Sequence, residues 1–234
     1  MLTLIKLFIL VAALVVISVG LYLAKRHGET RWVKVCDYIL VGLAGLSLMN
    51  YFYLMPFSFR PHYQEMFHYY VGSKYFPEVG YTRLYACVVR AEAESDDLLV
   101  RALAPERYIT DLETDNIVSA RPYSIDNTFC KSRFSASRWN EFKGDISFFH
   151  SRLEGVRWNN VLMDLGFNPS PVWELAGGHI SNSIPLSDQA LMRIKQIDVV
   201  LILGSIVCLV WAFGLPTTAF AVISFAALDS VVTR

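Results

Sequence analysis

The chain has long apolar stretches at both ends and a central stretch of mixed polarity. The apolar stretches run over about Leu7 to Ala24, Tyr38 to Phe57 and Val199 to Leu228, and the central stretch runs from Ser58 to Gln196. About 20 consecutive apolar residues, rising roughly 1.5 Å each, cross the ~30 Å hydrocarbon core of a bilayer as one α-helix. The pattern therefore predicts an all-α integral membrane protein.

The last apolar stretch is too long for one membrane span and too short for two. Gly214 and Pro216 interrupt it, and proline suits the first turn of a helix. We therefore expect a third span over about Ile194 to Phe213 and a fourth helix that begins near Pro216 and reaches Asp229. The prediction is three to four transmembrane helices, in a chain that forms the N-terminal part of a longer protein.

The loop between the first two apolar stretches is short and basic. It carries four cations and one acid: Lys25, Arg26, Arg31 and Lys34 against Glu29. Since short basic loops favour the cytoplasmic side, this loop is expected inside and the central stretch outside, on the periplasmic face of a bacterial inner membrane. The resulting organisation is two spans over 1–57, an outer segment over 58–196, and a third span with the start of a fourth over 197–234. A cleaved signal peptide is the alternative for the first stretch.

Composition and cysteine usage bear on the possible ligands and on the redox environment of the outer segment. Apolar residues make up 54% of the chain and charged residues 18%, with a formal net charge of zero, so no basic surplus favours binding to nucleic acid. Cys87 and Cys130 are the two cysteines of the outer segment, and an outside location is oxidising. They are expected either to form a disulfide or to be two buried free thiols.

The outer segment reads as short amphipathic helices that lie on a membrane face, with weak strand signals. We expect helices over Pro61 to Phe76, ended by Pro77, and over Thr82 to Ala104, with irregular or weakly extended chain over Tyr108 to Asn127. Shorter helices are expected over Val156 to Leu165 and Val172 to Ile180. In the first helix, the predicted helical stripe is Glu65, Tyr69, Gly72 and Phe76.

One further helix is predicted with a defined start and a defined buried face. Ser135 or Ser137 can cap it. Its apolar positions follow the spacing of an amphipathic helix, and we expect them to turn inward: Trp139, Phe142, Ile146 and Phe149.

Candidate chemistry concentrates just after the second apolar stretch. No phosphate-binding glycine loop, nucleophile elbow or CxxC pair is present, and the five histidines lack the spacing of a metal site, so neither a metal nor a cofactor is expected. Glu65 with His68 three positions on could act as general base for a hydroxyl acceptor. The residues that could contact a substrate are Tyr69, Lys74, Glu78 and Arg83. The alternative is an interfacial aromatic helix whose polar groups are only solvated.

This segment resembles a known family. The run from Glu65 to Phe76 (EMFHYYVGSKYF), followed by Gly80-Tyr81 and Leu84-Tyr85, resembles the first outer loop of GT-C-type membrane glycosyltransferases. The rest of the chain looks like the N-terminal part of uncharacterised bacterial multi-pass proteins of that organisation. The resemblance implies transfer of a sugar from a polyprenyl-phosphate donor, with Glu65 as base or orienting group and amphipathic helices on the membrane lipid.

A second function from a different class remains open. Aromatic-rich surfaces with few charges also suit protein interfaces. The chain could therefore be a non-catalytic membrane subunit whose outer helices bind a partner membrane protein.

Overall fold

A computed structural model describes residues 2–28, 30–54, 61–126, 128–153, 155–166 and 169–232. The predicted end of the second span at Phe57 and the acid Glu29 lie outside these residues. The chain divides into two compact units. We call Met1–Phe59 with Arg193–Arg234 the apolar unit, and Arg60–Met192 the central unit. The described residues are mostly helical, which confirms the all-α class.

The long helices agree with the apolar pattern. Among the described residues, three are long and apolar enough to cross a membrane: Lys6–His27, Arg31–Met49 and Asp188–Phe213. They belong to α1 (Leu2–His27), α2 (Arg31–Leu54) and α11 (Asp188–Phe213). After Gly214, which has a positive φ of 79°, α12 (Leu215–Val232) carries a shorter apolar stretch.

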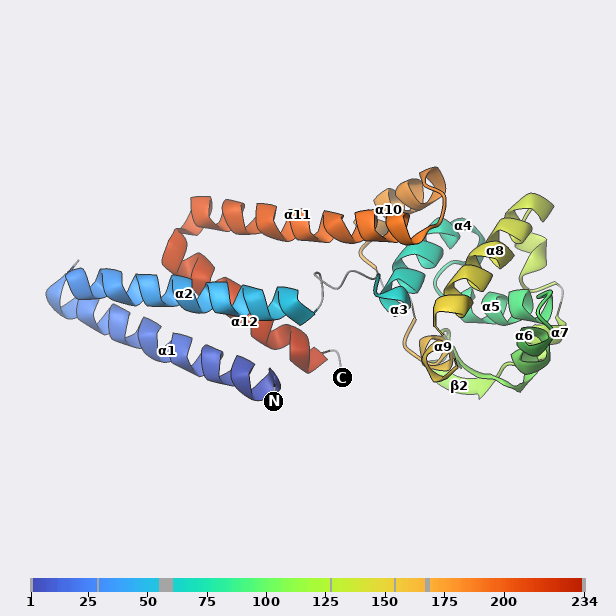
Figure 1. The fold of residues 1–234 in the computed structure, drawn as a ribbon, viewed down its shortest axis with the longest axis horizontal. Helices are drawn as coiled ribbons and strands as arrows, with labels where there is room; N and C mark the ends of the chain where they lie inside the picture. The colour runs from blue at the N-terminus through green and yellow to red at the C-terminus, as the bar shows by residue number, and fades with distance from the viewer. Residues whose placement is uncertain are drawn as a thin grey trace. The chain divides into compact units, whose positions relative to one another are not determined.

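In the apolar unit, α1, α2 and α12 lie side by side (Figure 1). Their contact is made by small and branched apolar side chains: Ile9 and Ala13 of α1, Leu40 and Ala44 of α2, and Ala219, Val222 and Ile223 of α12. Small residues allow helices to approach closely, which is a common packing solution where lipid surrounds a bundle. Gly20 shows this directly, because a Cβ there would lie 3.3 Å from Cys36 Cβ.

The central unit is built from short elements (Figure 1). In order they are α3 (Tyr63–Met66), the π-helix η1 (Phe67–Gly72), α4 (Phe76–Val79), α5 (Leu84–Ala93), α6 (Leu98–Leu103), the 3₁₀ turn η2 (Ala104–Glu106), β1 (Tyr108–Asp111), β2 (Asn116–Ser119), α7 (Arg121–Ile125), the 3₁₀ turn η3 (Lys131–Arg133), α8 (Ala136–Arg152), α9 (Val156–Leu162) and α10 (Pro171–Ser183).

The longest of these helices, α8, forms as the sequence predicts. The Ser135 hydroxyl accepts a hydrogen bond from the Arg138 backbone N–H and caps the helix. The four predicted inward positions are all buried: Trp139, Phe142, Ile146 and Phe149. Phe149 and Trp158 of α9 both meet the ring of Phe67 edge to face, so α8, α9 and η1 share one aromatic core.

The segment after Pro61 is helical, but its predicted stripe is wrong. The backbone widens into a π-helix at η1, which changes the angular position of each following residue. Glu65, which precedes the π-helix, and Tyr69 within it are exposed, whereas Gly72 at its end is buried. Pro77 does not end this helix either. It lies in the first turn of α4, where its missing N–H costs no hydrogen bond.

Two further predictions need correction. The expected helix over Thr82 to Ala104 is two helices, α5 and α6, and the Asp97 carboxylate caps α6 through the N–H groups of Leu99 and Val100. The stretch from Tyr108 contains a short antiparallel hairpin in which β1 pairs with β2. The Asp111 carboxylate accepts a hydrogen bond from the Glu113 N–H and so organises the turn.

Candidate functional site

Glu65 lies on α3 with its carboxylate open to solvent. Its side chain is 47% exposed, and its Oε1 lies 4.0 Å from Nδ1 of His62. The helix itself is anchored on either side of this residue. The Tyr63 hydroxyl donates to Asp188 Oδ1 over 3.0 Å, and Met66 is buried. Glu65 is therefore an accessible carboxylate on a fixed piece of backbone.

His68 is held inside the central unit. Its Nε2 lies 2.8 Å from the Tyr85 hydroxyl oxygen and 3.4 Å from Asp164 Oδ1. Because the Tyr85 hydroxyl donates its single proton to Asp164, His68 Nε2 must donate to Tyr85, which fixes the proton on that nitrogen. Burial opposes ionisation of Asp164, but the nearby His68 and the hydrogen bonds from the Tyr85 hydroxyl and the Gly166 N–H keep the pKa of this carboxyl below its usual value. His68 thus serves a buried network.

Lys74 is also buried, between two carboxylates. Its Nζ lies 2.7 Å from Asp145 Oδ2 and 2.7 Å from Glu141 Oε1. Burial disfavours the charged ammonium, yet these two carboxylates outweigh it and raise the pKa of Lys74. The Tyr75 hydroxyl donates to the same Asp145 oxygen over 2.8 Å. Lys74 is thus closed off from solvent and already paired with two carboxylates, so it is not open to a phosphate.

The other predicted substrate contacts are dispersed. Glu78 accepts a hydrogen bond from Arg138 Nε over 2.8 Å, and the Arg83 guanidinium lies over the ring of Phe129 at 5.1 Å. Tyr69 is exposed, and its ring meets Trp173 of α10 edge to face. Among the described residues, no hydrogen bond or ion pair joins Glu65 to His68 or Lys74. The structure therefore does not assemble the predicted set around one point.

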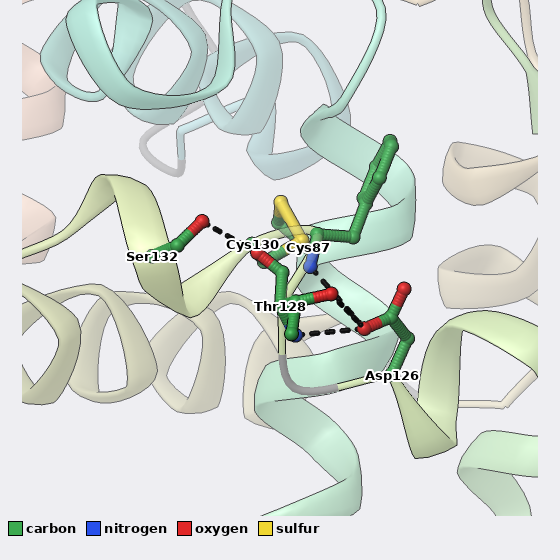
Figure 2. The surroundings of a disulfide bond; sticks show 6 residues. Cys87, Asp126, Thr128, Cys130 and Ser132 are labelled. Carbon is green, nitrogen blue, oxygen red and sulfur yellow. Dashed lines mark hydrogen bonds between the residues drawn. A yellow bond between two sulfur atoms is a disulfide. The ribbon is translucent and has the colours of Figure 1, made fainter.

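Cys87 and Cys130 form a disulfide, with Cα atoms 5.4 Å apart (Figure 2). This is the first of the two alternatives that the sequence left open. Cys87 belongs to α5 and Cys130 precedes η3, and both are buried. Beside the bond, Asp126 Oδ1 accepts hydrogen bonds from the Thr128 N–H and hydroxyl, which shapes the loop that leads to Cys130. The bond ties this irregular loop to the core.

The sequence analysis missed the acids that complete these networks, Asp145 and Asp164. Asp145 did leave a signal, because it lies three residues after Phe142 and therefore on the apolar face of α8. A carboxylate on a buried face requires a cation or donors, and Lys74 and Tyr75 supply them. Asp164 left no such signal. Within the described residues, no group of three or more His, Cys, Asp or Glu side chains could hold a metal ion.

These features define a helical protein with three apolar helices of membrane-spanning length and a disulfide-bonded central unit of short helices. The chain matches no family model, no curated protein and no solved structure.

Proposed function

We propose that this chain is part of a bacterial inner-membrane glycosyltransferase of GT-C-like organisation, with its central unit on the periplasmic side. The carrying observation is Glu65, an exposed carboxylate on an anchored helix within the segment that resembles the first outer loop of such enzymes. A base that acts on a lipid-borne substrate must be open to it and fixed in place, because misplacement by about 1 Å costs much of the rate.

The buried networks favour different roles for the neighbouring residues. Since His68 and Lys74 are engaged by Asp164 and Asp145, they position the backbone that carries Glu65. The cation that we propose to meet a phosphate is Arg152, whose side chain is 35% exposed. It donates to Asp188, the same carboxylate that binds Tyr63, two residues before Glu65. The Cys87–Cys130 disulfide supports the oxidising side of the membrane as the location of the central unit.

The test uses membranes that contain the whole protein and a radiolabelled polyprenyl-phosphate sugar. Glu65→Gln removes the base and keeps the side-chain shape, so transfer should fall by at least about 10²-fold. Glu113→Gln, which changes an acid of the hairpin turn that is also exposed, is the matched control and should retain activity. Arg152→Gln should raise the apparent KM for the donor. Full activity of Glu65→Gln would remove the catalytic assignment.

A partner-binding function is the second candidate, and α6 favours it. None of its residues is buried, and its leucines Leu98, Leu99 and Leu103 are exposed. Exposed apolar side chains that lie together commonly mark a protein interface. A photo-crosslinking residue at position 99 should give one discrete protein adduct in native membranes, and the same residue at position 113 should give none. Adducts with lipid alone would count against this function.

A further inference from the structure

A groove lies in the central unit, and Glu65 is not among the residues that line it. It is bounded by the end of α5 and the turn that follows, by the start of α6, and by residues 140–151 of α8. Its volume is about 530 Å³, within the range of roughly 300–1,000 Å³ that is typical of small-ligand sites. All of its walls belong to the same compact unit.

The floor of the groove is a buried network with fixed protonation. Arg107 Nε donates to Glu92 Oε2 over 2.9 Å, and Trp158 Nε1 donates to Glu92 Oε1 over 2.8 Å. Arg107 Nη2 lies 3.4 Å from His150 Nε2, and a guanidinium can only donate, so the His150 proton is on Nδ1. Burial and the nearby Arg107 both lower the pKa of His150. In the floor the Arg107 guanidinium is thus paired with the Glu92 carboxylate, which leaves no net charge there.

The charges of the walls are largely compensated. Of the three lining carboxylates, Glu94, Asp96 and Asp97, the first is paired with Arg90, Lys131 and Lys143. The Asp97 carboxylate accepts the backbone N–H groups that begin α6. Serine hydroxyls at 95, 147 and 151 and the amide of Asn140 complete the polar lining. Compensated charges beside free hydroxyl and amide groups favour a ligand that is rich in hydrogen-bonding groups and carries no net charge.

At one position of α8 no side chain separates the groove from the helix backbone. Gly144 lies in the middle of the helix, and a Cβ built there would meet nothing within 4 Å. Val100 adds apolar surface beside the polar groups. Polar and apolar contacts side by side suit a pyranose ring, which presents hydroxyl groups at its edge and C–H groups on its faces.

We propose that this groove binds a neutral carbohydrate. The inference goes beyond the transferase activity and does not depend on it, since the groove is built from residues other than Glu65 and its neighbours. A chain with no transferase activity would keep this site.

The test is direct binding to the purified full chain in a zwitterionic detergent that has no sugar headgroup. The probes are three neutral trisaccharides: chitotriose, cellotriose and mannotriose. Saturation-transfer NMR and calorimetry measure their binding. At least one should bind, and Gly144→Leu should weaken that binding at least tenfold by filling the groove. Leucine has a higher helix propensity than glycine, so this variant should fold at least as well.

Gly204→Leu in α11 is the matched control, since a Cβ built there also meets nothing within 4 Å, and it should leave binding unchanged. Asp96→Asn should weaken binding without altering the unfolding temperature. The proposal is overturned if none of the three trisaccharides binds, or if Gly144→Leu and wild type bind equally. Binding of trigalacturonate or of spermidine in place of the neutral probes would also overturn it, by assigning the groove to charged ligands.

Discussion

Lys74 Nζ lies 2.7 Å from Asp145 Oδ2, and both side chains are buried although 71 residues separate them in the chain. This pair joins the segment that carries Glu65 to α8. A buried ion pair of this kind adds little net stability over an apolar pair, but loss of one partner is costly because the other charge stays buried.

Lys74→Met should therefore lower the free energy of unfolding by about 3–5 kcal/mol. Thermal and urea unfolding in detergent, followed by tryptophan fluorescence, measure the change. Lys74→Met with Asp145→Leu should recover part of the loss, since no charge is then stranded. If Lys74→Met unfolds like wild type and loses only transfer activity, Lys74 acts on the substrate and the structural role is wrong.

Removal of the disulfide should also destabilise the central unit. Cys87→Ala with Cys130→Ala opens a loop of 43 residues, and the expected cost is about 2–4 kcal/mol. Because both sulfurs are buried, thiol labelling of the native protein should leave them unmodified until it is unfolded and reduced. Ready labelling of both cysteines in the native protein would argue for free thiols.

Glu94 predicts a particular dependence of stability on pH. Burial opposes its ionisation, but hydrogen bonds from Lys131, Trp139 and Arg90 lower its pKa to about 2. A depressed folded pKa stabilises the native state above the unfolded value of about 4.3, and this stabilisation is lost as the pH falls towards 2.

Glu94→Gln should therefore cost roughly 1–2 kcal/mol at pH 7, after allowance for solvent screening. The difference between wild type and variant should shrink below about pH 4.3 and vanish near pH 2. Unfolding curves for the two proteins across this pH range test the direction in which the stability difference changes. A difference that grows as the pH falls would contradict it.

The proposed orientation can be tested by cysteine accessibility. Val172 on α10 is exposed, so Val172→Cys should react with a membrane-impermeant maleimide added to intact cells. The background should carry Cys36→Ser and Cys208→Ser, because these are the free cysteines of the described chain. Reaction only after permeabilisation would place the central unit in the cytoplasm and remove the basis for a periplasmic activity.

Much of the helical structure could be predicted from local sequence patterns. The stripe from Trp139 to Phe149 and the cap at Ser135 follow from helical periodicity and hydrogen-bonding chemistry, which act over a few residues. The hairpin at Tyr108 was missed because its strands are short and its turn holds no glycine. The partnership of His68 with Tyr85 and Asp164 was out of reach, since it depends on how distant segments pack.

The π-helix at η1 has a consequence for chain length. Its wider turns hold one more residue than a regular α-helix would over the same rise. Deleting a single residue between Phe67 and Gly72 would therefore let the segment relax to a regular α-helix, with Glu65 before it and Lys74 after it keeping their places. Lys74 would still reach Asp145. A one-residue gap in this segment would thus mark a chain with the same core, whereas a gap inside a regular helix such as α8 would rotate the residues after it by about 100°.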